Sequence, residues 1–144
     1  MIKLNIAIGN DHAGTALKFK VMAAFEDKCN FINFGTDELS SVDYPDYVHP
    51  LANSVKNGES NLGILICGSG NGVCMTANKH ENIRAALCWT KEICELARQH
   101  NNANVICIPA RFVTEEAALE IIAAFLATDF EGGRHQNRVE KINL

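Results

Sequence analysis

A cysteine that directly precedes a glycine-rich run is the first feature of the sequence that could do chemistry. Cys67 opens the run CGSGNG, which ends at Gly72. Glycines at alternate positions expose main-chain N–H groups at the entrance to a helix, where they can bind an anion or stabilise an enediolate. The same helix N-terminus favours the thiolate form of Cys67, which can act as a base. The alternative is a tight strand-to-helix connection that binds nothing.

An acid and an imidazole stand side by side in the run GNDHAG. Asp11 and His12 lie between two glycines at a strand-to-helix turn, where either side chain could contact a ligand. Equally, Asp11 could cap the next helix while His12 is a solvated turn residue. The run is not a P-loop, because Thr15 and Ala16 occupy the positions of the lysine and hydroxyl residue.

A second imidazole lies in the polar run QHNNAN. His100 follows a helical pattern and precedes an apolar run. Histidine suits proton transfer near neutral pH, but one at a helix C-terminus is often only a partner for the helix dipole. The residue is therefore a candidate whose role the spacing alone does not decide.

Two arginines near the end of the chain are spaced to share a helix face. Arg134 and Arg138 stand at i and i+4 after two glycines that stop the preceding helix. Two neighbouring guanidiniums predict a phosphate clamp, and the alternative is an ordinary solvated terminal helix, expected at about residues 134–143.

The elements that must position these residues alternate along the chain. Short apolar runs typical of buried parallel strands alternate with amphipathic stretches, which predicts a βαβ protein of the α/β class. We expect strands at Leu4–Gly9, Asn30–Gly35, Leu62–Cys67, Arg84–Leu87 and Asn104–Ile108. We expect helices at about Ala16–Lys28, Tyr47–Asn57, Asn71–Lys79, Lys91–Gln99 and Glu115–Ala127. Because ligands bind beyond the carboxyl ends of parallel strands, the loops there are where chemistry is expected.

Composition excludes several classes of protein. The 144 residues fit one domain, and a formal net charge of -4 gives no basic field for nucleic acid. No stretch is apolar enough to cross a membrane and no signal peptide is apparent, so we expect a cytoplasmic protein. The six cysteines are therefore expected to be reduced, and their spacing predicts no metal site.

Five runs together resemble one family. The runs GNDHAG, VDYP, ICGSGNG with ANK, RQHNNAN and EGGRHQNRVE, in this order, closely resemble the ribose-5-phosphate isomerase B family of sugar-phosphate isomerases. The resemblance implies a three-layer α/β/α sandwich around a five-stranded, Rossmann-like parallel sheet. It also implies a homodimer in which both subunits contribute to each active site. The reaction implied interconverts D-ribose 5-phosphate and D-ribulose 5-phosphate without a metal or an organic cofactor.

The resemblance also implies roles for individual residues. Cys67 matches the base that moves a proton between C2 and C1, and His100 matches the imidazole that opens the furanose ring. The other implied catalytic groups are Ser69, at the substrate oxygens, and Asp11, partner of the imidazole. The implied substrate-binding residues are Gly68, Gly70, Asn71 and Gly72 at the enediolate, Asn101 and Tyr44 at the sugar, and His12, Arg111, Arg134 and Arg138 at the phosphate. Among these, Arg111 resembles an arginine that enters from the neighbouring subunit, and Asp43 is expected to line the pocket.

The departures from the family pattern bear on base and substrate. One branch of the family carries a glutamate base directly after GSGNG, where this chain has Val73, so only Cys67 can serve as base at either position. Val73 also breaks the G-x-G-x-x-G pattern of a nicotinamide site. Ser69 stands where threonine is commoner and Asn71 where an aliphatic residue is frequent, which affects the expected sugar preference.

Two alternative functions therefore stay open at this point. The nearer is an isomerase of the same family for allose 6-phosphate or galactose 6-phosphate. The farther is a non-catalytic sugar-phosphate sensor on the same scaffold. A sensor needs the cations and the glycine loop but neither a base nor a ring-opening imidazole, so Cys67 and His100 favour the enzyme.

Overall fold

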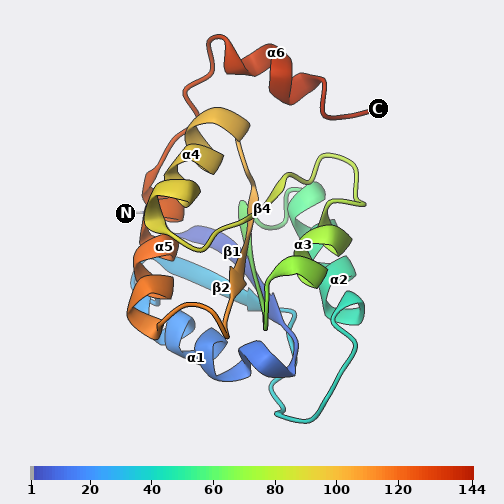
Figure 1. Cartoon of the computed structure of the whole chain (residues 1–144), viewed down its shortest axis with the longest axis vertical. Coiled ribbons are helices and arrows are strands. Elements are labelled where there is room, and N and C mark those ends of the chain that lie inside the picture. The colour runs from blue at the N-terminus through green and yellow to red at the C-terminus, as the bar shows by residue number, and fades with distance from the viewer. Residues whose placement is uncertain (1) are drawn as a thin grey trace.

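A parallel sheet forms the centre of the structure, which is a computed structural model and describes residues 2–144 (Figure 1). Its strands are β1 (Leu4–Asn10), β2 (Cys29–Asn33), β3 (Leu62–Cys67), β4 (Ala85–Leu87) and β5 (Val105–Pro109). Their order is β2-β1-β3-β5-β4, and every pairing is parallel. The inner strands β3 and β5 are buried almost throughout, which is why their sequences are continuous apolar runs.

Helices cover both faces of the sheet, so the predicted three-layer α/β/α arrangement is confirmed (Figure 1). One face carries α1 (Thr15–Ala24), α4 (Lys91–Asn101) and α5 (Glu115–Ala127). The other face carries α2 (Pro45–Lys56) and α3 (Asn71–Ala77). A short 3-10 turn, η1 (His12–Gly14), precedes α1, and α6 (His135–Glu140) lies beyond the C-terminal end of α4.

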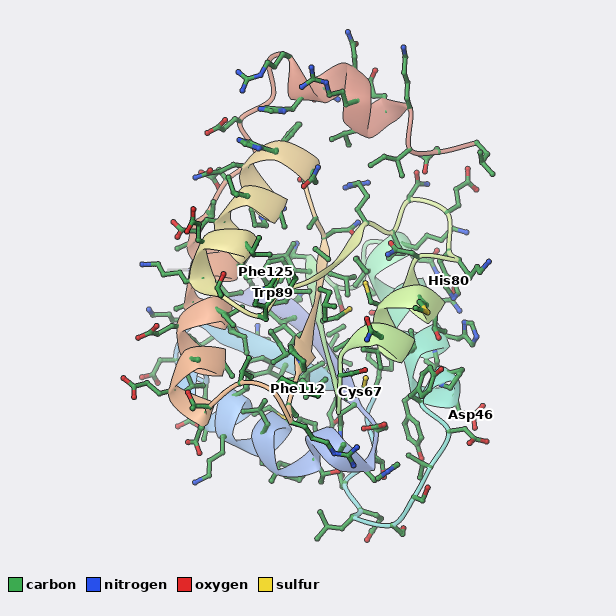
Figure 2. The ribbon with its side chains drawn as sticks, in the orientation of Figure 1. Asp46, Cys67, His80, Trp89, Phe112 and Phe125 are labelled. Carbon is green, nitrogen blue, oxygen red and sulfur yellow. The ribbon has the colours of Figure 1, made fainter. Side chains whose placement is uncertain are left out.

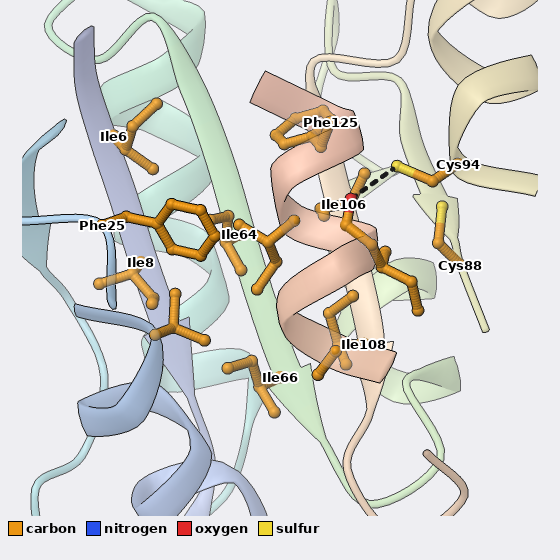
Figure 3. Close-up of a cluster of buried hydrophobic side chains, with 14 of the residues drawn as sticks. Ile6, Ile8, Phe25, Ile64, Ile66, Cys88, Cys94, Ile106, Ile108 and Phe125 are labelled. Carbon is orange, nitrogen blue, oxygen red and sulfur yellow. Dashed lines mark hydrogen bonds between the residues drawn. The ribbon is translucent and has the colours of Figure 1, made fainter. Parts of the chain in front are cut away.

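Alternate residues of each strand build two separate cores. Ile64 and Ile66 of β3 belong to the core beneath α1, α4 and α5, which Figure 3 shows with the isoleucines of β1 and β5. Leu65 and Cys67 point to the opposite core, beneath α2 and α3. Burying one such aliphatic side chain stabilises the fold by about 1.5–3 kcal/mol. The alternation also decides that the Cys67 side chain lies on the α2–α3 side.

The observed helix ends differ from the predicted ones for local reasons. The helix predicted to reach Lys28 ends at Ala24, because residues 25–28 form the turn that feeds β2. The helix predicted from Tyr47 begins at Pro45, whose fixed φ suits the first helical turn. The terminal helix predicted for about residues 134–143 covers only His135–Glu140.

Two observations bear on the expectations from composition. The six cysteines carry no disulfide. Within residues 2–144, no helix combines the length and the apolar character that crossing a membrane requires.

The sheet topology creates a crevice between β1 and β3. From β1 the chain moves outward to β2, and it then returns past β1 to β3 and continues to the other edge. The connections that leave β1 and β3 therefore run to opposite sides, which opens the sheet edge at their carboxyl ends. GNDHAG and CGSGNG both follow these strand ends.

Candidate active site

Three loops at the carboxyl edge of the sheet are joined by main-chain hydrogen bonds. The N–H of Asp11 donates to the carbonyl of Ile66 (3.2 Å). The N–H groups of Ala110 and Arg111 donate to the carbonyls of Cys67 (2.9 Å) and Gly68 (3.0 Å). The loops that follow β1, β3 and β5 are thus held side by side, as the parallel sheet requires.

Cys67 ends β3 at the centre of this edge (Figure 2). Its side chain is 5% exposed and packs in the same core cluster as Val73 and Cys107. Val73 is fully buried, so this position contributes only core packing. Of Cys67 and Val73, only Cys67 has a side chain that can take a proton.

The glycine loop after Cys67 is in close contact with two side chains. A Cβ on Gly68 would lie 3.0 Å from Arg111 Nη1, and one on Gly72 would overlap the ring of Tyr44. Gly70 has a φ of +74°, a left-handed conformation that glycine adopts without strain. Glycine is therefore strongly favoured at Gly70 by its backbone conformation and at Gly72 by the ring of Tyr44, whereas at Gly68 the flexible Arg111 side chain could shift.

A cleft lies beside this loop and contains several of the predicted residues. Its volume is about 620 Å³, within the range of small-molecule sites. It is lined by Asp11, His12, Val42, Asp43, Tyr44, Pro45, Asp46 and Arg111. The structure thus brings together residues that are about 100 positions apart in sequence.

Hydrogen bonds orient the acid and the imidazole of this cleft. The Nδ1 of His12 accepts from the N–H of Val42 (3.2 Å), so the neutral ring carries its proton on Nε2. Asp11 Oδ1 accepts from the N–H of Ala13 (2.9 Å), which confirms that Asp11 caps the following turn. A carboxylate has a second oxygen, so capping and substrate contact are compatible.

The hydroxyl of Ser69 stands in the glycine loop, next to the start of α3. Ser69 is half-buried, and its hydroxyl accepts from the N–H of Asn71 (3.3 Å) at the start of α3.

Several of the other cysteines have thiols whose pKa values are shifted by their surroundings. Burial raises the pKa of Cys107, whereas a hydrogen bond with Cys107 lowers the pKa of its neighbour Cys74. A hydrogen bond with Cys94, followed by burial, raises the pKa of Cys88. The thiols of Cys88 and Cys107 therefore remain protonated core groups.

The other predicted site residues lie at the opposite end of the sheet. His100 and Asn101 end α4, which leads into the amino end of β5, whereas Cys67 pairs with Pro109 at its carboxyl end. The length of β5 alone separates the two ends by about 13 Å. Arg134 and Arg138 lie on α6 or directly before it, at the same distant end (Figures 1 and 2).

We therefore divide the predicted residues into two groups. The cradle group comprises Asp11, His12, Tyr44, Arg111 and the run Cys67–Gly72, and the far group comprises His100, Asn101, Arg134 and Arg138. Arg111, which we expected to enter from a neighbouring subunit, instead lies against Gly68 of its own chain. The conformation of Pro109–Arg111 places it there, because the Arg111 N–H bonds to the Gly68 carbonyl.

Two residues beside the far group, Glu131 and His135, were not predicted from the sequence. His100 stacks on His135, with ring centroids 4.2 Å apart and planes 15° apart. The Nε2 atoms of both rings lie 3.9 Å from Glu131 Oε1. Burial, followed by the charges of His100 and Arg134, lowers the pKa of His135. Both missed residues stand in the run EGGRHQNRVE, which had been interpreted only through its arginines.

This cluster is also the one place in residues 2–144 where three potential metal ligands gather. The ligand atoms of His100, Glu131 and His135 all lie within 4.8 Å of one another. The nearly parallel rings, however, direct their nitrogen lone pairs side by side and not toward one point. The arrangement therefore suits ring stacking better than the tetrahedral coordination that zinc prefers.

A buried polar network supports the turn that carries Asp11 and was not predicted either. The Lys18 side chain is fully buried and donates to the carbonyl of Thr36 (2.6 Å) and to Asp37 Oδ1 (2.5 Å). The amide of Asn10 donates to the carbonyls of Asp11 (2.9 Å) and Thr36 (3.0 Å). Helical spacing gave a signal, since Lys18 shares a face with the buried residues Gly14 and Val21.

Comparison with known proteins gives consistent matches over almost the whole chain. The sequence model described as Ribose/Galactose Isomerase matches residues 6–142. Ribose-5-phosphate isomerase B from Escherichia coli is 43% identical over 138 residues, which cover 95% of this chain and 93% of the relative.

Two solved structures match as closely. A ribose 5-phosphate isomerase from Thermotoga maritima has a TM-score of 0.95 at 43% identity and covers 97% of each chain. Ribose-5-phosphate isomerase B from Mycoplasma genitalium, solved with bound ribulose-5-phosphate, has a TM-score of 0.93 at 44% identity. That match covers 99% of this chain and 95% of the other.

Proposed function

Because the chain belongs to the ribose/galactose isomerase family, we propose that it interconverts D-ribose 5-phosphate and D-ribulose 5-phosphate. It is an aldose–ketose isomerase of the non-oxidative pentose phosphate pathway. The observation that carries this function is the position of Cys67, at the end of a central strand between a glycine loop and a cleft that contains His12 and Arg111.

Proton transfer between C2 and C1 is assigned to Cys67. Its thiolate removes the C2 proton of the open-chain aldose, which gives an enediolate, and a proton moves from the C2 hydroxyl to the C1 oxygen. The thiol then returns its proton to C1. The N–H groups of the loop Gly68–Gly72 stabilise the negative oxygens, and the Ser69 hydroxyl assists there. Preorganised donors of this kind act only where charge develops, so they lower the barrier and not merely the energy of binding.

Ring opening must come before this step, because ribose 5-phosphate is mainly a furanose. We assign to His100 the donation of a proton to the ring oxygen as the bond from that oxygen to C1 breaks. Asp11 accepts the proton of the C1 hydroxyl, which leaves the aldehyde. Asn101, next to the imidazole, binds the sugar.

Phosphate binding is assigned to one imidazole and three arginines. His12 offers Nε2–H from the cleft, and Arg111 adds a guanidinium from the same chain. Arg134 and Arg138 complete the set, because planar guanidiniums can bind two phosphate oxygens at once. Tyr44, which packs on Gly72, and Asp43 form the wall on the sugar side.

A homodimer with shared active sites reconciles this chemistry with the structure. The far group of one chain lies too distant from its own Cys67 to act on the same sugar. In a two-fold dimer, each chain can place its far group over the cradle group of the other, which gives two identical sites. Arg111 then belongs with Cys67, and His100 comes from the second copy.

We further propose that residues 1–144 act as one cytoplasmic domain that needs neither a metal nor an organic cofactor, and neither a nucleic acid nor a membrane. A net charge of -4 supports this choice, since it offers no general attraction for polyanions.

An assay of the purified protein on ribose 5-phosphate, with and without a chelator, tests this function. We expect turnover that the chelator leaves unchanged, and slower turnover of allose 6-phosphate and galactose 6-phosphate. Phosphate-dependent binding without conversion of any of these sugars would show a sensor and not an isomerase. Loss of turnover in chelator would contradict the metal-free mechanism.

A further inference from the structure

His135 is a buried imidazole to which the mechanism above gives no role. It is the first residue of α6, and its side chain is 8% exposed, whereas the His100 side chain is 37% exposed. Its Nε2 is buried without a hydrogen-bond partner. A buried nitrogen without a partner destabilises the fold, so the residue is not explained by core packing alone.

The contact between the two rings fixes an otherwise mobile side chain. The terminal torsion of a histidine is broad, so a half-exposed ring samples many planes. Stacking at 4.2 Å and 15° restricts the His100 ring to one plane and leaves its remaining surface toward solvent. General acid catalysis depends on such a restriction, because the donor nitrogen must meet the ring oxygen at hydrogen-bond distance.

The surroundings of the stack disfavour a charge on the buried His135 ring. Two imidazoles at this distance repel each other when both are charged. His135 is the more buried ring and lies beside Arg134 and Arg138, all of which disfavour its charged form. Glu131 Oε1 lies 3.9 Å from the Nε2 of each ring. The charged form of the buried His135 ring is therefore disfavoured, and the His100 ring is the one that faces outward.

We propose that His135 is a positioning residue that holds the plane of the His100 imidazole for ring opening through the stacking contact. The inference rests on the proposed role of His100. The helix α6 would then have two roles, because it carries Arg138 and also His135, which orients the His100 imidazole. Substrate phosphate and ring-opening imidazole are thereby placed by one short element.

Two readouts separate ring opening from isomerisation. Conversion of ribose 5-phosphate needs both steps. Incorporation of solvent deuterium at C1 of ribulose 5-phosphate needs only enediolate formation at Cys67, because that ketose has no free 5-hydroxyl with which to close a furanose.

The test compares His135→Leu, which removes the planar partner, with His135→Phe, which keeps it. We expect His135→Leu to lower kcat for ribose 5-phosphate about 10- to 100-fold, the usual effect of a misplaced catalytic group, while exchange into ribulose 5-phosphate changes less than about threefold. His135→Phe should recover conversion to within about threefold of wild type, since the ring plane is what matters. Thermal unfolding of both variants shows whether they are equally folded.

Several outcomes would overturn the inference. Unchanged conversion in His135→Leu would show that the stack is not needed, and equal loss of conversion and exchange would show a general disturbance of the site. Failure of His135→Phe to recover conversion while it remains folded would exclude stacking as the cause. If wild type neither converts ribose 5-phosphate nor exchanges the C1 proton, the proposed function itself fails. If His100→Ala converts ribose 5-phosphate normally, only the role of His100 fails.

Discussion

The cradle group and the far group are held in place in different ways. Main-chain hydrogen bonds between loops of neighbouring strands fix the cradle group, and glycines bring Tyr44 and Arg111 directly onto the backbone. The far group lies at the end of α4 and on or directly before the six-residue α6, and these two helices are joined by the stacking of His100 on His135. A parallel sheet thus organises the cradle group, whereas the far group depends on α4 and α6, and we propose that a second copy of the chain brings the two groups together.

The largest effect should come from the centre of the cradle group. Cys67→Ala removes the base, so we expect both ribose 5-phosphate conversion and C1 deuterium exchange to fall by about 100- to 10,000-fold. The fold should persist, because a buried cysteine is small. Cys88→Ala is the matched control, since Cys88 is also buried but lies in the other core, and both activities should survive there. Substantial turnover by folded Cys67→Ala would sink the mechanism.

The next largest effect should come from the far group, and it should change KM and not kcat. Arg138→Ala should raise KM for ribose 5-phosphate about 10- to 100-fold, because a charge-assisted hydrogen bond contributes about 1.5–3 kcal/mol. The kcat should change little. Lys141→Ala, which removes an exposed cation that directly follows the same helix, should leave KM unchanged. Equal shifts in both variants would indicate a general charge effect.

A smaller effect should come from the contact between the glycine loop and Tyr44. Gly72→Ala places a methyl group where the Tyr44 ring lies, so the ring must move into the cleft. We expect kcat/KM to fall about tenfold, equivalent to roughly 1.4 kcal/mol. The double variant Gly72→Ala with Tyr44→Ala relieves the overlap, so its loss should be smaller than the sum of the single losses. Simple additivity would show that the two residues act independently.

The smallest effect should be a pH dependence of the free energy of unfolding that arises at His135, beside the far group. Burial lowers the pKa of His135 below its usual 6.5, so the unfolded chain binds a proton that the native chain excludes. The free energy of unfolding should therefore fall as the pH drops below about 6.5, and it should level off below the native pKa. His80, whose pKa burial also lowers, adds to the effect with the same sign.

Denaturant titrations of wild type and His135→Phe at several pH values isolate this contribution. His80 is present in both proteins, so only the His135 part differs between them. The variant should lose less stability on acidification than wild type does. Identical pH profiles would show that His135 titrates alike in the folded and unfolded chains.

The sequence was sufficient to predict that Asp11 and Cys67 lie at one edge of the sheet, because that placement follows from local rules. Apolar runs predict parallel strands, and parallel strands bring their carboxyl ends to one edge, so Asp11 and Cys67 had to be neighbours. The contact of Tyr44 with Gly72 could not be derived in this way, since it depends on how α2 packs on α3. The resemblance supplied the role of Tyr44, but not that contact.

For the far group, the resemblance predicted which residues take part and what they do, but not where they lie relative to Cys67. His100 precedes β5 and so belongs to the edge of the sheet opposite to Cys67, yet the resemblance gave His100 and Arg138 roles at the same site without showing how the two ends meet. The stack between His100 and His135 joins two segments through tertiary packing, and neither segment reveals it alone. The position of Arg111 was mistaken for a related reason, because a resemblance assigns a role without fixing which copy of the chain supplies it.

Mixed dimers test the central claim, that each active site combines the cradle group of one chain with the far group of another. Cys67→Ala and the double variant His100→Ala with Arg138→Ala should each be almost inactive toward ribose 5-phosphate. When the two chains are co-expressed in equal amounts, half of the dimers contain one of each, and each such dimer has one intact site. The account predicts recovery of about a quarter of wild-type activity. Activity no higher than that of the separate variants, in a sample shown to contain the mixed dimers, would contradict it.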